Sequence, residues 1–175
     1  MIHRYRICVV CTGNICRSPM AEYLLREAFG EAGLGHAVEV SSAGTSAEEL
    51  GNPIDPRTAE TLARHGHPDL GWDEHRARRF DGSWFDGLDL VLAADRWHER
   101  TLRRLAPSDS DRAKVAMLRA FDPAAADVGR LDVDDPWYGG AEGFDRTHEE
   151  IVGAVPGIVD HVRAALGRRD AAAQT

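Results

Sequence analysis

Cysteine is scarce in this sequence, and long apolar runs are missing from it. The three cysteines all fall within the first sixteen residues, so they cannot form a disulfide framework that holds the rest of the chain. No apolar run approaches the length that spans a bilayer, and residues 1–10 lack the long apolar segment of a secretory signal. We therefore expect a cytoplasmic protein in a reducing compartment, without a membrane partner.

The sequence also has fewer basic than acidic residues. The 21 Lys and Arg residues are outnumbered by 29 Asp and Glu residues, which gives a net charge of −8. Nucleic acids and anionic membranes attract surfaces with a positive field, so this balance argues against a nucleic-acid partner and requires any anion site to be local. A chain of 175 residues that is 43% hydrophobic can bury one sizeable core, and we find no internal repeat. The expectation is a single domain.

Short β-branched runs alternate along the chain with apolar residues at helical spacing. Strands are expected at 7–10, 38–41 and 88–93 and within 115–121, and helices at 18–33, 56–65, 95–105 and 151–166. This alternation predicts an α/β fold in a single domain, with a central four-stranded parallel sheet, helices on both faces and a phosphate-binding loop after the first strand.

Three segments depart from this regular pattern. Pro156 and Gly157 predict an interruption of the last helix. Residues 124–135 carry no periodicity and predict a surface loop. The polar, alanine-rich end predicts a domain over residues 1–167 and a flexible tail over 168–175.

The most informative segment follows the first predicted strand. Cys11 is separated from Arg17 by five loop residues, and Ser18 and Pro19 then suit the N-cap and first position of a helix. The loop amides and the helix N-terminus can therefore converge on one point, against the Cys11 sulfur. The Arg17 guanidinium adds a planar fork that binds two phosphate oxygens at once. These residues predict a phosphate cradle.

Cys8 and Cys11 also form a C-x-x-C pair, which could indicate a redox or zinc site. Val9 and Val10 between them favour an extended strand, and odd spacing on a strand sends two side chains to opposite faces. We therefore interpret Cys8 as a small core residue and expect no metal site.

The run VCTGNICRSPMAE at residues 10–22 resembles the active-site signature of the low-molecular-weight protein tyrosine phosphatases. The likeness covers most of the chain, because further segments match in the same order. They are Ser-Ala-Gly-Thr at 42–45, His-Arg-Ala-Arg at 75–78, Leu-Arg-Ala-Phe-Asp-Pro at 118–123 and Asp-Pro-Trp-Tyr at 135–138.

The resemblance implies a metal-independent phosphotyrosine phosphatase with no cofactor, acting on proteins and releasing inorganic phosphate. By this resemblance Cys11 is a thiolate nucleophile that forms a cysteinyl-phosphate, Arg17 binds the phosphate and Asp135 is the general acid. The implied phosphate-binding residues are Thr12, Gly13, Asn14, Ile15, Cys16, Arg17 and Ser18. The implied supports of the loop are Asn14, Ser18, Ser42 and His75, and Ser18 also eases departure of the thiolate.

The resemblance also gives expectations for the rim and for oxidation. Trp137 replaces a tyrosine usual in the family, and Tyr138 follows it; at Glu48 the chain is acidic where many members carry a nearby tryptophan. We expect these three residues at the pocket rim, where Glu48 and its neighbours would favour substrates with basic flanks. Cys16 matches the cysteine that can protect the nucleophile by forming a disulfide with it; the alternative is a buried loop residue without a redox role.

Three other functions compete with this one. Arsenate reductases share the fold and loop but relay oxidation through later cysteines, and no cysteine follows Cys16. Phosphoarginine phosphatases tend to carry threonine where this chain has Ile15, and an apolar side chain favours an aromatic ester. A non-catalytic phosphate-binding module would have no use for both Cys11 and Asp135. We expect a monomer.

Overall fold

The computed structural model describes residues 4–174. Met1 to His3 and Thr175, at the limits of the predicted domain and tail, lie outside the described residues. Four parallel strands form one sheet in the order β2-β1-β3-β4. The strands are β1 (Tyr5–Cys11), β2 (Val38–Gly44), β3 (Leu90–Ala93) and β4 (Val115–Met117). The predicted four-stranded parallel sheet is confirmed.

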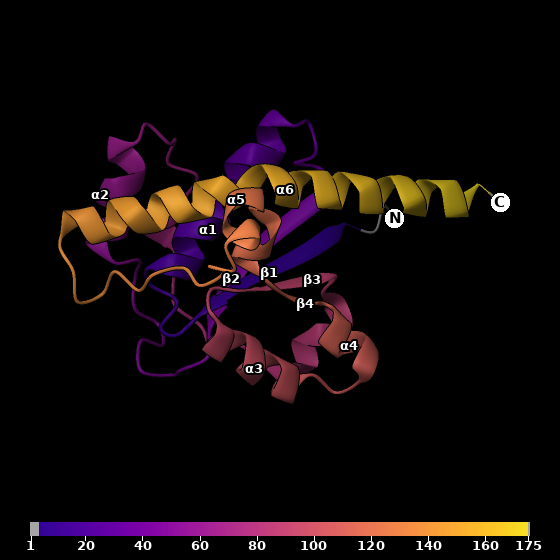
Figure 1. The fold of residues 1–175 in the computed structure, drawn as a ribbon, viewed down its shortest axis with the longest axis horizontal. Helices are drawn as coiled ribbons and strands as arrows, with labels where there is room; N and C mark the ends of the chain where they lie inside the picture. The colour runs from indigo at the N-terminus through magenta and orange to yellow at the C-terminus, as the bar shows by residue number, and fades with distance from the viewer. Residues whose placement is uncertain (1–3, 175) are drawn as a thin grey trace.

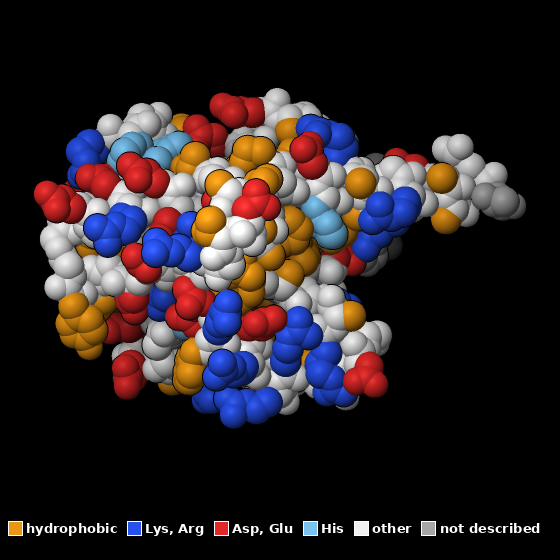
Figure 2. All heavy atoms as spheres, in the orientation of Figure 1, with side chains coloured by type: hydrophobic (Ala, Val, Ile, Leu, Met, Phe, Trp, Pro, Cys, Tyr) orange, Lys and Arg blue, Asp and Glu red, His pale blue; other side chains and the backbone are white. Residues whose placement is uncertain are grey.

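Helices cover both faces of the sheet (Figure 1). On one face lie α1 (Arg17–Glu31), α2 (Pro56–Arg64) and α6 (Ala141–Ala173). On the other lie η2 (Gly82–Gly87), α3 (Arg96–Leu105) and α4 (Asp109–Ala113), where Lys and Arg side chains gather on the surface (Figure 2). Shorter elements are η1 (Trp72–Glu74), η3 (Leu118–Phe121) and α5 (Pro123–Asp127).

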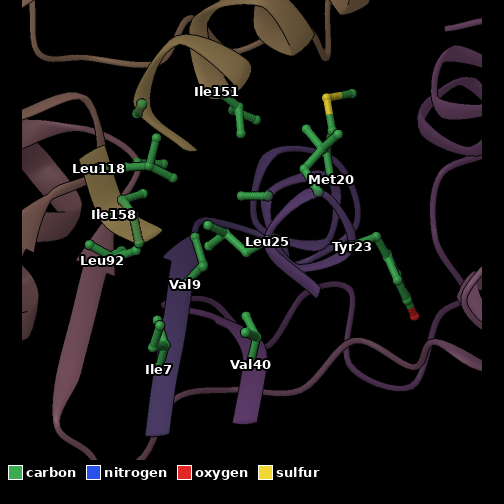
Figure 3. Close-up of a cluster of buried hydrophobic side chains, with 14 of the residues drawn as sticks. Ile7, Val9, Met20, Tyr23, Leu25, Val40, Leu92, Leu118, Ile151 and Ile158 are labelled. Carbon is green, nitrogen blue, oxygen red and sulfur yellow. The ribbon is translucent and has the colours of Figure 1, made fainter. Parts of the chain in front are cut away.

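Two hydrophobic clusters separate along the central strand. Ile7 and Val9 point into the cluster under α1 and α6, whereas Cys8 and Val10 point into the cluster under α3. Figure 3 shows Val9 beside Leu25 of α1, in a cluster that also contains Ile151 and Ile158 of α6. A strand buried on both faces is typical of a parallel sheet. Cys8 is therefore a core residue, as predicted, and lies on the opposite face from Cys11.

The last helix is continuous, so the predicted interruption at Pro156 is wrong. Pro156 lies inside α6, and Ala154 and Ile158 on either side of it are fully buried. A Cβ added to Gly157 would lie 2.1 Å from the Phe121 carbonyl oxygen, so glycine is what lets α6 lie against η3. Packing on both sides of the proline offsets the roughly 3 kcal/mol that proline costs inside a helix.

Smaller differences concern the ends of elements. The helix α6 continues to Ala173 and its end projects past the body of the molecule, where the sequence predicts a tail (Figure 1). The segment 124–135 is not loop throughout, because Asp122 caps α5 and Pro123 begins it. The strand β2 extends to Gly44, past the predicted end at Ser41. Within residues 4–174, no helix combines the length and hydropathy needed to cross a bilayer.

Candidate active site

The phosphate-type loop runs from Cys11, the last residue of β1, to Arg17, the first residue of α1. In an open α/β sheet, ligands bind beyond the carboxyl ends of the strands, where connections diverge to either side. The strand β1 occupies that position, since β2 and β3 flank it. A Cβ on Gly44 would lie 2.4 Å from the Thr12 carbonyl oxygen, so the loop can pack on the end of β2 only because residue 44 is glycine.

Cys16 is the N-cap of α1, so the prediction that Ser18 caps this helix is wrong. The Ser18 hydroxyl is instead fully buried and lies 3.0 Å from the Cys11 sulfur. It accepts a hydrogen bond from Asn14 Nδ2 at 2.9 Å, which leaves its own hydrogen free to bond the sulfur or the Ala43 carbonyl, 3.3 Å away. The backbone N–H of Asn14 donates to the Cys11 sulfur at 3.3 Å. The Cys11 sulfur therefore lies among hydrogen-bond donors.

Asn14 holds the loop in a strained shape. Its φ of 60° lies in the left-handed region, which is unfavourable for a residue with a Cβ. Its buried side chain compensates, because Nδ2 also donates to Ser42 Oγ at 2.8 Å and Oδ1 accepts from the Arg78 amide at 3.0 Å. His75 Nε2 donates to the Asn14 carbonyl at 2.7 Å. Burial lowers the pKa of His75, so a neutral ring makes this bond.

Three groups from distant parts of the chain meet at Arg17, which is 4% exposed. Its Nη1 donates to Asp95 Oδ2 at 3.1 Å and to the Val133 carbonyl at 3.2 Å, and its Nη2 donates to Asp135 Oδ2 at 3.0 Å. The Asp135 side chain is half exposed, and its other oxygen accepts from the Trp137 amide at 3.1 Å. The guanidinium is thus held beside the loop, next to an acid that solvent can reach.

A pocket of about 220 Å³ opens above the loop. Its lining brings together most of the residues predicted from the sequence, with Glu49 beside Glu48. The lining residues are Cys11, Thr12, Gly13, Ile15, Cys16, Arg17, Glu48, Glu49, Asp135, Trp137 and Tyr138. Asn14 belongs to the loop but lies outside this lining, as do the three residues that contact it, Ser18, Ser42 and His75.

Most of the chain matches known proteins. The model of the low molecular weight phosphotyrosine protein phosphatase family matches residues 6–169. The chain belongs to this family. A low molecular weight protein-tyrosine-phosphatase of Streptomyces coelicolor is 53% identical over 167 residues, which cover 95% of this chain and 99% of the relative.

Solved structures agree with this membership. A protein tyrosine phosphatase from Entamoeba histolytica matches with a TM-score of 0.84 at 25% identity, over 92% of this chain and 98% of the other. Vibrio vulnificus Wzb in complex with benzylphosphonate matches with a TM-score of 0.75 at 25% identity, over 90% and 99% of the two chains.

Cys16, the second cysteine in the loop of this phosphatase, lies in a different environment from Cys11. All three cysteines, each among the described residues, are free thiols. Cys16 is buried, and its thiol donates to Asp55 Oδ2 at 3.7 Å. Burial, reinforced by the charges of Asp55 and Cys11, raises the pKa of Cys16 well above its usual range. Cys16 is therefore a thiol at neutral pH.

Sequence reasoning missed four groups that hold the site. Glu22 accepts from the Ser42 hydroxyl at 2.5 Å, and Asp55, the N-cap of α2, donates its backbone N–H to the Ile15 carbonyl of the loop at 2.9 Å. Asp95 contacts Arg17, and His98 Nε2 lies 2.8 Å from Thr12 Oγ1. Asp55 and Asp95 each precede a helix as good N-caps, a signal present in the sequence. Their contacts with the loop depend on which elements the fold brings together.

The described residues contain no cluster of three or more histidine, cysteine or carboxylate side chains arranged to hold a metal ion.

Proposed function

We propose that this phosphatase hydrolyses phosphotyrosine in proteins through a cysteinyl-phosphate intermediate, with Asp135 as general acid and no metal ion. One observation carries the proposal: Cys11, Arg17 and Asp135 line the same pocket, and Arg17 contacts Asp135. A nucleophile, an oxyanion-binding fork and a proton donor within one small cavity are what phosphoryl transfer to sulfur requires. A phosphate-binding module without catalysis would need the cation but neither the thiol nor the acid.

In the first step the Cys11 thiolate attacks phosphorus. The S–P bond forms as the bond from phosphorus to the tyrosine oxygen breaks, and the electron pair of that bond leaves on the phenolic oxygen. Protonated Asp135 transfers its proton to this oxygen. Arg17 and the loop amides bind the oxygens on which negative charge is spread, so catalysis rests on positioning and charge stabilisation.

In the second step water attacks the cysteinyl-phosphate. The Asp135 carboxylate accepts a proton from the water as the water oxygen bonds to phosphorus. The S–P bond breaks, and inorganic phosphate is released. The electron pair returns to Cys11 as a thiolate. The Ser18 hydroxyl, 3.0 Å from this sulfur, can donate a hydrogen bond to the developing charge.

The rim supports an aromatic substrate. Trp137 and Tyr138 line the pocket with exposed rings, and Arg57 lies 5.4 Å from the Trp137 ring centroid and so steadies it. Ile15 adds an apolar wall. Rings packed edge to face or offset contribute about 0.5–1.5 kcal/mol beyond the area they bury. The complex of Vibrio vulnificus Wzb with benzylphosphonate, an aromatic phosphonate, is consistent with this interpretation.

The competing substrate is phosphoarginine, which the acidic residues Glu48 and Glu49 at the rim could attract. The deciding experiment measures steady-state hydrolysis of a phosphotyrosine peptide and of phosphoarginine, with chelator and reductant present, for the wild type and Cys11→Ser. We expect phosphotyrosine turnover to persist with chelator and to vanish in Cys11→Ser. A preference for phosphoarginine would overturn the substrate, and activity in Cys11→Ser would overturn the nucleophile.

A further inference from the structure

His98 is a fully buried histidine that the proposed reaction does not use. It lies in the first turn of α3, on the face of the helix that meets the phosphate loop. Its Nε2 is 2.8 Å from the hydroxyl oxygen of Thr12, the residue that follows the nucleophile. Thr12 lines the pocket, and its carbonyl accepts from the Ser46 amide at 3.0 Å. The backbone of Thr12 is thus held by Ser46, which follows β2, and its side chain is held by His98.

The other side of the ring faces Asp95. His98 Nδ1 lies 3.0 Å from Asp95 Oδ1, although within residues 4–174 no acceptor meets this nitrogen with the geometry of a hydrogen bond. Oδ1 already accepts from the Trp97 and His98 amides, while Oδ2 binds Arg17 Nη1 at 3.1 Å. Burial opposes ionisation of Asp95, but His98 and then Arg17 outweigh it and hold the pKa of Asp95 well below its usual range.

We propose that His98 is a positioning residue for phosphoryl transfer, which acts through Thr12 and Asp95 to hold the two ends of the phosphate loop in one geometry. The contacts form a chain from Arg17 through Asp95 and His98 to Thr12. Its two ends lie on either side of the loop that would bind the transferred group. This inference rests on the proposed function, since it concerns how the same phosphate site is held.

The proton arrangement follows from the same contacts. The Asp95 carboxylate beside Nδ1 favours the tautomer with its proton on that nitrogen. Nε2 is then an acceptor, and the Thr12 hydroxyl donates its hydrogen to it. The hydroxyl hydrogen is therefore directed at the histidine, which fixes the rotamer of Thr12 at the pocket wall.

A buried histidine can also serve packing alone, and the two roles respond differently to substitution. Glutamine places its terminal amide near the position of histidine Nε2, where the amide oxygen can accept the Thr12 hydroxyl hydrogen, whereas asparagine reaches only to the position of Nδ1. His98→Gln therefore keeps a polar partner for Thr12, and His98→Asn keeps one only for Asp95. His98→Leu removes both and fills the space. A packing role predicts that leucine is tolerated at least as well as glutamine.

The test measures kcat and KM for a phosphotyrosine peptide, the inhibition constant of inorganic phosphate, and thermal unfolding for these three variants. We expect His98→Leu to lose about tenfold in kcat/KM, mostly in kcat, the loss of roughly one hydrogen bond in the transition state. His98→Gln should recover most of this and His98→Asn little. The matched control is His148→Leu, another buried histidine, on α6, which should change unfolding and leave the kinetics as they are.

A double-mutant cycle with Thr12→Val isolates the contact from general damage. If His98 acts through Thr12, the double variant Thr12→Val, His98→Leu should lose no more in kcat/KM than the more impaired single variant. Additive losses, or His98→Leu within twofold of the wild type, would overturn the inference. A wild type without phosphotyrosine turnover would instead refute the proposed function, so the two failures are distinguishable.

Discussion

Arg17 Nη2 and Asp135 Oδ2 lie 3.0 Å apart, so the proposed oxyanion-binding fork and the proposed general acid are already in contact. The arginine is almost fully buried, whereas the aspartate side chain is half exposed. A phosphate bound by Arg17 would compete with this carboxylate for the same guanidinium. The acid therefore influences binding of the oxyanion as well as proton transfer.

Asp135→Asn tests both effects at once. We expect kcat to fall by about 10²–10⁴-fold on phosphotyrosine, because the proton donor is lost. We also expect inorganic phosphate and vanadate to bind more tightly, by about tenfold or roughly 1.4 kcal/mol, because a competing negative charge is removed. Steady-state kinetics and inhibition constants measure these changes. Weaker binding of oxyanions in this variant would contradict the competition.

Asn14 offers a test of the strained loop. Asn14→Ala should lower the free energy of unfolding by roughly 2–4 kcal/mol, since it leaves buried partners unsatisfied and keeps a Cβ at a φ of 60°. Asn14→Gly loses the same side chain but tolerates this φ, so it should be more stable than the alanine variant by about 1 kcal/mol. Urea denaturation measures both. Equal stability of the two variants would mean that backbone strain contributes little.

Cys16 should determine whether oxidation of the enzyme is reversible. Peroxide converts the Cys11 thiolate to a sulfenic acid, which the Cys16 thiol can attack to form a disulfide and release water. Both cysteines line the same pocket. We expect the wild type to regain its activity in dithiothreitol after peroxide treatment, and Cys16→Ser to regain much less. Equal recovery would leave Cys16 as a buried loop residue without a redox role.

The acidic rim residues Glu48 and Glu49 should make the enzyme prefer peptides with basic residues around phosphotyrosine. Glu49 packs on the loop, since a Cβ built at Gly13 would lie 3.0 Å from its Cγ, and Asn52 Nδ2 holds its carboxylate at 2.7 Å. We expect peptides with basic flanks to show a kcat/KM about two- to fivefold higher than acidic ones at low salt, falling as salt screens the charges. The double variant Glu48→Gln, Glu49→Gln should abolish the preference. Similar rates for both peptides in the wild type would refute it.

Stability should depend on pH through a histidine cluster between α2 and α6. The His148 ring stacks on His65 with centroids 4.0 Å apart, and its Nε2 lies 2.8 Å from His67 Nε2. Figure 2 shows histidine side chains gathered among charged groups over this contact. The surrounding charges are Glu27, 2.5 Å from His67 Nδ1; Asp145, 2.9 Å from His65 Nε2; and Arg64, which also binds Asp145.

Burial, with smaller contributions from His65 and His67, lowers the pKa of His148 to about 4. The unfolded chain, where histidine has a pKa near 6.5, therefore binds more protons than the folded chain between these values. The contribution of neutral His148 to the free energy of unfolding is fully present above about pH 6.5. It is lost as the pH falls toward 4, by roughly 1–2 kcal/mol after allowing for solvent screening. Denaturation curves across this range should show a flatter pH dependence for His148→Gln. An unchanged slope would assign the acid sensitivity to other groups.

The sequence predicted the parts of this protein that depend on local pattern. The alternation of strands and helices, the parallel sheet and the loop from Cys11 to Arg17 follow from residue spacing and chain punctuation, which act over a few residues. The resemblance to the family added Asp135, Trp137 and Tyr138, which the structure brings to the pocket. It also added Ser42 and His75, which contact Asn14 from distant elements.

Tertiary structure decided what depends on contacts between distant elements. Local propensity makes Ser18 a helix cap and Pro156 a helix break, but burial against Cys11 and close packing of α6 on η3 outweigh both preferences. The sequence marks Asp95 only as a helix N-cap and does not single out His98. Both reach the loop because β3 pairs with β1, which carries the start of α3 to the same edge of the sheet. The sequence alone determined the chemical groups of the loop and its place between a strand and a helix. The fold determined which groups hold that loop, because a contact between residues 86 positions apart has no local signature.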